Sequence, residues 1–189
     1  MKKLLAVLFA AVLVLGLGAG TAQALPVPLS IGDAYYLGLI NDGIPSSTAD
    51  EVVYVNYLTT LSAGQGNTQL PAATGEIYNR LNSTVAGPFP AAVYSGRNDA
   101  SPTNNVINVT GFAYVLGKYG SNASLVWFVN GALGEVSLPG SYVPPGGQGG
   151  GLSHITWFTP VTVPDGGATL MLLGGALVGL GALRRKFRA

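Results

Sequence analysis

The chain has 189 residues, the length of a single domain, and 48% of them are hydrophobic while only 9% are charged. It contains no cysteine and one histidine, which excludes disulfide bonds and metal sites built from thiolates or several imidazoles. Seven acids and three bases between Leu25 and Thr162 leave that region a net charge of −4, so it has no basic patch and nucleic acid is not an expected partner.

The amino terminus has the three regions of a secretory signal peptide. Met1-Lys2-Lys3 is a positive start, Leu4 to Leu17 is an unbroken apolar run, and Ala22-Gln23-Ala24 is a cleavage site of the small-x-small type. We therefore assign residues 1–24 to a signal peptide and expect signal peptidase to cleave after Ala24. An uncleaved membrane anchor is the alternative.

The next segment, residues 25–162, is predicted to be the exported domain. Pro26 and Pro28 make an extended entry, and the apolar and aromatic residues from Leu29 to Ile40 predict a first strand. The turn residues Asn41-Asp42-Gly43 end that strand.

One amphipathic helix is expected after this turn. Ser46-Ser47-Thr48 supply hydroxyl caps, and Asp50 and Glu51 place acids in the first helical turn, where they favour the positive end of the helix dipole. Apolar residues follow at the spacing of a single buried helical face, namely Tyr54, Tyr57, Leu58 and Leu61. Gly64 and Gly66 are expected to end the helix.

The region from Gly75 to Asn105 gives weaker signals. Gly75 to Thr84 fits either a helical turn or a strand, and Gly96 to Asn105 is predicted to be a polar loop. That loop contains Asn98, Asp99 and Asn104, whose oxygens are of the type that binds calcium. Because the cluster holds only one carboxylate, we interpret it as a solvated turn and expect no metal site.

From Val106 onward the chain is predicted to form successive strands separated by turns. The segments rich in β-branched and aromatic residues are Val106 to Val109, Phe112 to Lys118, Leu125 to Asn130, Glu135 to Leu138 and Leu152 to Thr159. This spacing favours a mainly β fold, an antiparallel β-sandwich with the one helix. In the last strand, alternation places Ile155 and Trp157 on one face and His154, Thr156 and Phe158 on the other.

No constellation in the sequence indicates catalysis. His154 follows Ser153, but neither lies in a nucleophile-elbow context, and we expect an imidazole hydrogen-bonded at a sheet edge. The seven acids are scattered, so no pair is predicted for glycoside hydrolysis, and Gly146 to Gly151 lacks the residues of a nucleotide-binding loop. We therefore expect no catalytic residue, no cofactor and no metal.

A carbohydrate-binding module is a competing interpretation of the exported domain. Exposed tyrosine and tryptophan rings could stack on sugars, and an exopolysaccharide is then a possible partner. Trp127 and Trp157 lie in strongly apolar strands, so we expect both to belong to the core instead.

The last 27 residues, 163–189, combine a turn, an apolar run and a basic end. Val163-Pro164-Asp165-Gly166-Gly167 is a non-helical segment, and residues 168–183 carry no charge, which predicts a transmembrane helix rising roughly 24 Å. Residues 184–189 contain four cations, which are retained on the cytoplasmic side. They are Arg184, Arg185, Lys186 and Arg188.

This order of parts resembles the C-terminal sorting signals of the PEP-CTERM type, and most closely the Val-Pro-Asp-Ser-Gly variant. Gly166 stands where that variant has serine. The resemblance implies that a membrane-embedded exosortase processes residues Val163 to Gly167 and that the chain is anchored in the inner membrane until then. It also implies a surface or matrix protein of structural or adhesive function. A plain single-pass anchored ectodomain is the alternative.

Overall fold

The computed structural model describes residues 24–41, 47–66, 68–69, 76–121, 123–131, 133–145, 147–161, 171–178, 180 and 184. The predicted signal peptide up to Gln23, the sorting motif 163–167 and most of the predicted span and basic tail lie outside the described residues. Residues 171–178 are helical, and none of the helices among the described residues is long and apolar enough to cross a membrane.

The exported domain is mainly β, as the sequence predicts. Its helix is α2 (Thr48–Thr60). The strands, in chain order, are β1 (Val27–Pro28), β2 (Tyr36–Asn41), β3 (Thr68–Gln69), β4 (Ile77–Asn79), β5 (Ala92–Asp99), β6 (Val106–Asn108), β7 (Tyr114–Tyr119), β8 (Ala123–Phe128), β9 (Glu135–Ser137), β10 (Ser141–Tyr142) and β11 (Gly150–Pro160).

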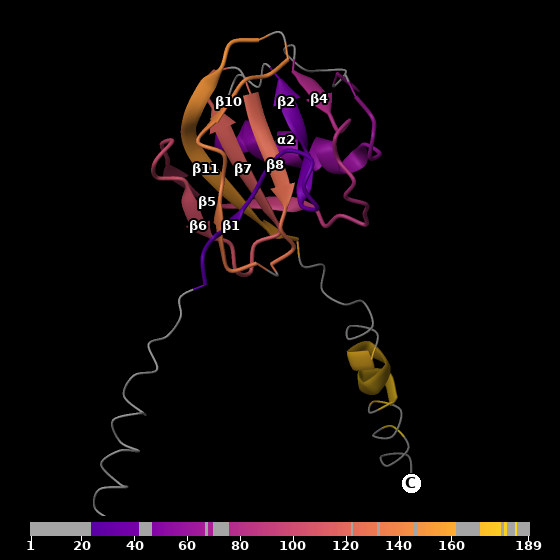
Figure 1. Ribbon diagram of the computed structural model, residues 1–189. Coiled ribbons are helices and arrows are strands. Elements are labelled where there is room, and N and C mark those ends of the chain that lie inside the picture. Colours follow the sequence, from indigo (N-terminus) through magenta and orange to yellow (C-terminus); the bar gives the residue numbers. More distant parts are fainter. Residues whose placement is uncertain are drawn as a thin grey trace, which may run out of the picture.

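Most strands belong to one antiparallel sheet that curves into a half-barrel (Figure 1). The strand order is β10-β11-β7-β8-β2-β4-β3, and β5 adds to β11 on the side away from β7. β11 is the longest strand, and it pairs with β5, β7 and β10. The last strand of the domain therefore holds one half of the sheet together.

A second, smaller sheet covers one face of the first. It has the order β1-β9-β6, with β1 parallel and β6 antiparallel to β9, so it is a mixed sheet. Its Val136 packs in one core with Val115 and Trp127 of the main sheet. The predicted antiparallel sandwich is thus only partly correct, because the second layer is small and mixed.

The helix α2 covers the opposite face of the main sheet, where its side chains form a second core with Leu37, Leu116 and Phe158. Its start is the predicted one. Ser47 is the N-cap, and Ser47 and Asp50 form a reciprocal capping box. The helix ends at Thr60, before the predicted glycines.

Two predictions for the loops and strands need correction, and one open choice is resolved. The first long strand begins at Tyr36 and not at Leu29, because Asp33 accepts backbone hydrogen bonds from Ser30 and Tyr35 and closes a turn there. Residues 96–99 are the end of β5 and not a loop, since an edge strand tolerates polar side chains on both faces. The ambiguous segment after Gly75 contains the strand β4.

Candidate functional site

The single histidine lies in the interior of the main sheet and not at its edge. His154 on β11 is flanked by Asp99 of β5 on one side and Lys118 of β7 on the other. Its side chain is 4% exposed and lies on the face that α2 covers. The predicted edge position is wrong because β5, whose residues from Gly96 onward we interpreted as a loop, adds a strand beyond β11.

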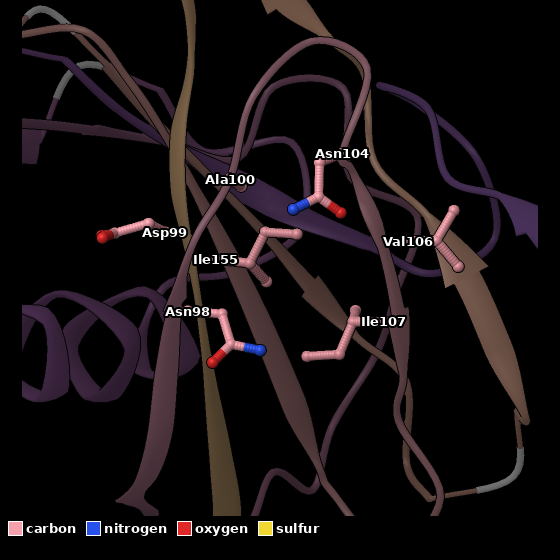
Figure 2. A pocket seen from close by; sticks show the side chains of 7 residues that line it. All are labelled: Asn98, Asp99, Ala100, Asn104, Val106, Ile107 and Ile155. Atoms are coloured by element: carbon pink, nitrogen blue, oxygen red, sulfur yellow. The ribbon is translucent and has the colours of Figure 1, made fainter.

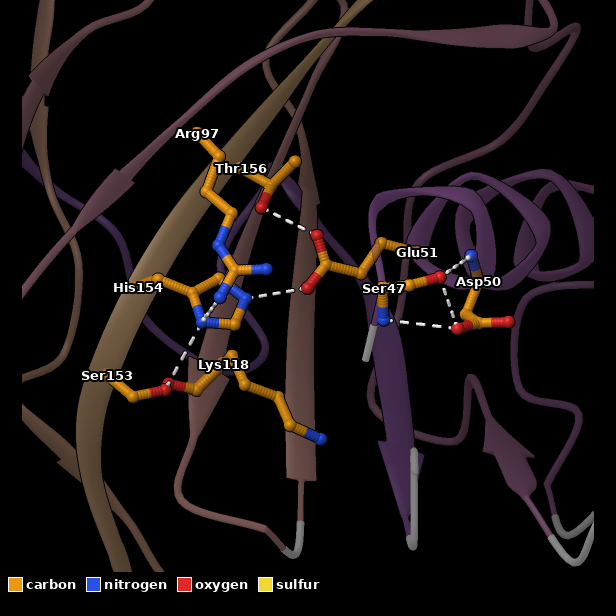
Figure 3. A network of polar contacts seen from close by, with 8 residues as sticks. All are labelled: Ser47, Asp50, Glu51, Arg97, Lys118, Ser153, His154 and Thr156. Atoms are coloured by element: carbon orange, nitrogen blue, oxygen red, sulfur yellow. Dashed lines mark hydrogen bonds and ion pairs between the residues drawn. The ribbon is translucent and has the colours of Figure 1, made fainter. Parts of the chain in front are cut away.

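Glu51 of α2 meets this histidine beneath the helix (Figure 3). Its side chain has no solvent exposure, and its Oε1 lies 2.6 Å from His154 Nε2. The hydroxyl of Thr156, two residues along the same face of β11, donates to Oε2 at 2.6 Å. Both carboxylate oxygens therefore receive a hydrogen bond from β11, which joins the helix to the centre of the sheet.

The other ring nitrogen of His154 faces Arg97 of β5. Arg97 Nη2 lies 3.0 Å from His154 Nδ1. A guanidinium only donates hydrogen bonds, so Nδ1 is the acceptor and the ring proton is on Nε2, facing Glu51. The result is a chain from a cation through a neutral imidazole to a carboxylate, and it spans β5, β11 and α2.

Ser153 is close to this histidine without being set up as a nucleophile. Its Oγ lies 3.4 Å from His154 Nδ1, but its one hydroxyl proton is donated to the Lys118 carbonyl oxygen at 3.0 Å. Arg97 donates a hydrogen bond to the same ring nitrogen, Nδ1, over the shorter distance of 3.0 Å. In a serine hydrolase the base must accept the nucleophile's proton, and here the acceptor nitrogen is already in use.

The two tryptophans lie where the sequence predicts. Trp127 is fully buried, and its Nε1 donates to the Ser30 carbonyl oxygen at 3.1 Å. Trp157 is half-buried and its indole lies over Gly96 of β5, where an added Cβ would come within 2.4 Å of the ring. Both indoles therefore serve packing, and neither is displayed as a flat sugar-stacking surface.

The polar residues that we weighed as calcium ligands line a cavity of about 40 Å³ between β5 and β6. Figure 2 shows the Asp99 carboxylate pointing away from the other labelled side chains. In the described part of the chain, no three residues of His, Cys, Asp or Glu type are grouped so that they could hold a metal ion. The cavity has room for an ordered water but not for a sugar or a cofactor.

An open groove of about 360 Å³ lies beside Arg80 and Phe89. Arg80 is 1% exposed, and burial lowers its pKa. Its guanidinium donates to the carbonyl oxygens of Leu37, Leu61 and Val85 and to the Ser83 hydroxyl. Because Leu61 caps the carboxyl end of α2, Arg80 is the cation that this end of the helix lacks in its own last turn.

The described part of the domain ends at Val161, two residues before the predicted sorting motif. β11 stops at Pro160, and the Val161 amide donates to the Ala91 carbonyl oxygen at 2.8 Å. Thr162 alone lies between Val161 and Val163 in the sequence. At the other end, Ala24 of the predicted cleavage site is exposed, whereas Ala22 lies outside the described residues.

The sequence contained one signal for the buried network that we did not use. The buried positions of α2 are Glu51, Tyr54, Val55 and Leu58, which have the spacing i, i+3, i+4 and i+7. An acid thus occupies the first position of the apolar stripe. We interpreted it as a first-turn acid, although its place on the stripe indicates a buried partner in the sheet.

These features describe an exported β domain whose last strand leads directly into a C-terminal sorting segment. Residues 162–187 match the family model of the VPDSG-CTERM motif. The chain therefore carries a PEP-CTERM-like exosortase sorting signal, and the motif implies export, processing by an exosortase and sorting to the cell surface. Neither the curated proteins nor the solved structures include a match to this chain.

Proposed function

We propose that the chain is a non-enzymatic surface or matrix protein, anchored in the inner membrane by residues 168–183 and then processed within Val163 to Gly167. In its mature form the domain has a structural or adhesive function. The observation that carries the proposal is that the buried polar side chains beneath α2 are bonded within the fold. The Glu51 carboxylate accepts from His154 and Thr156, and the second ring nitrogen of His154 accepts from the exposed Arg97 side chain.

The surface of the domain supports a structural function over sugar binding. Trp127 is buried and the half-buried Trp157 packs against the core, so the two side chains that the carbohydrate-binding interpretation needs most are used in packing. The edge strands β3 and β10 have only two residues each, which limits their pairing with other chains.

Mass spectrometry of the protein from its native host, with both ends mapped, tests the proposal. We expect an amino terminus at Leu25 and a carboxyl end within Val163 to Gly167. In a host without the exosortase, the protein should keep residues 184–189 and remain in the membrane. Retention of residues 184–189 in the wild-type host would contradict processing and favour the plain single-pass anchored ectodomain.

A further inference from the structure

The chain enters the domain and leaves it at the same end of the main sheet. β1 runs parallel to β9 with Val27 beside Val136, so Leu25 lies level with Gly134. Phe158 near the end of β11 pairs with Tyr114, and Tyr114 pairs with Phe128. Figure 1 shows the start of β1 and the end of β11 together at this end of the domain.

Two loops lie between the two chain exits, and their described residues are 109–113, 129–131 and 133–134. A Cβ added at Gly131 would lie 3.6 Å from the Gly111 backbone, and the amides of Val129 and Asn130 both donate to the Ala113 carbonyl oxygen. Neither loop contains a charged residue. We name these two loops, with Leu25 and Val161, the exit face.

The acids nearest the exit face are Asp33 and Glu135. The Asp33 carboxylate accepts the amides of Ser30 and Tyr35 in its own turn, whereas Glu135 is exposed at the start of β9. Leu25 is 89% exposed, and Val161 is also exposed. The face therefore presents apolar and neutral side chains, which lose little on approaching a lipid surface. Cleavage after Ala24 adds the α-amino group of Leu25, a cation that is attracted to headgroup phosphates.

The length of chain between the domain and the predicted span restricts which face can approach the membrane. Residues 162–167 extend at most about 20 Å. The eleven residues of β11 alone span roughly 36 Å. The opposite end of the domain, with the loop around Val143, is therefore too far away to reach the membrane surface while the chain is anchored.

We propose that the exit face is a membrane-apposed surface, held against the lipid headgroups during the anchored stage. This inference rests on the proposed function, because it requires the anchor at residues 168–183. It implies that the exosortase reaches its motif beneath a folded domain, within about 20 Å of the bilayer.

Single cysteines with an environment-sensitive fluorophore test the orientation, and the chain has no native cysteine to interfere. Gly134→Cys labels the exit face, where an added Cβ meets no atom within 4 Å. Val143→Cys, at a position 65% exposed, is the matched control, because its loop is also uncharged but lies at the opposite end. The full chain is reconstituted in phosphatidylcholine vesicles that contain a headgroup-linked quencher.

We expect the label at position 134 to be quenched several-fold more strongly than the label at position 143. A chain that alkaline carbonate extracts from the vesicles would overturn the anchored stage and this inference with it. An inserted chain with equal quenching at both positions would overturn the orientation alone. If the label at position 134 is shielded from solvent only in host membranes that contain the exosortase, the face would contact the enzyme and not lipid.

Discussion

A carboxylate without solvent exposure has lost its hydration, and Glu51 recovers that free energy only through its hydrogen bonds to His154 and Thr156. The imidazole in turn bonds to Arg97, so the negative charge is balanced across one neutral ring. A network of this kind stabilises the fold only when all of its members are present.

Replacing Glu51 by alanine should therefore lower the free energy of unfolding by about 2–6 kcal/mol, since it leaves the His154 Nε2 proton and the Thr156 hydroxyl unpaired in the core, at about 1–3 kcal/mol each. Urea denaturation followed by circular dichroism measures this loss. Glu135→Ala removes an exposed acid and should change stability by less than about 0.5 kcal/mol. Similar values for the two variants would mean that the network contributes little.

The strand β5 is a long edge strand, and three features limit its pairing with other chains. The amide of Asn56 on α2 bonds both to the Ala92 N–H and to the Ala92 carbonyl oxygen, at 2.8 and 3.0 Å. A bulge leaves Ser95 without a partner opposite, and Arg97 places a charge on the strand. Edge strands with such features resist the addition of a further strand.

Asn56→Ala should both destabilise the domain by about 1–3 kcal/mol and promote self-association, because two backbone groups of the edge lose their partner. Denaturation measures the first effect, and sedimentation velocity measures the second. Asn98→Ala, at an exposed position on the same strand, is the control. An Asn56 variant that stays monomeric at concentrations where the wild type is monomeric would show that the carboxamide does not protect this edge.

The whole domain buries several tyrosines on both sides of the main sheet. Burial raises the pKa of Tyr114 and of Tyr119 above the ordinary value of about 10. Both hydroxyls donate to carbonyl oxygens, of Pro90 and Pro139 respectively. The folded state therefore keeps these phenols protonated at a pH where the unfolded chain releases their protons.

The domain should consequently lose stability as the pH rises above about 10, because the unfolded state then binds fewer protons than the folded state. Below that pH the contribution of these tyrosines is fully present. Alkaline titration, with tyrosinate absorbance and circular dichroism recorded together, should show the buried phenols ionising only as the sheet unfolds. Ionisation of all nine tyrosines while the circular dichroism remains native would contradict this.

The capped helix, most of the strands after Val106 and the sorting tail were predictable from the sequence, and the signal peptide stays a prediction. Each depends on local patterns, such as an apolar run beside a charge, a serine before an acid or a glycine at a turn, and such patterns act over a few residues. The alternation in β11 correctly placed Ile155 and Trp157 on one face and His154 and Thr156 on the other.

Tertiary contacts decided the rest. Glu51 and His154 are 103 residues apart, and the residues next to each one do not indicate that the two side chains pair. The polar segment at Gly96 becomes a strand only because β11 offers an open edge and Trp157 covers the glycine. The position of both chain exits at one end of the domain likewise follows from which strands pair. Strand pairing depends on complementary surfaces from segments that are distant in the sequence, and local sequence patterns do not predict which segments pair.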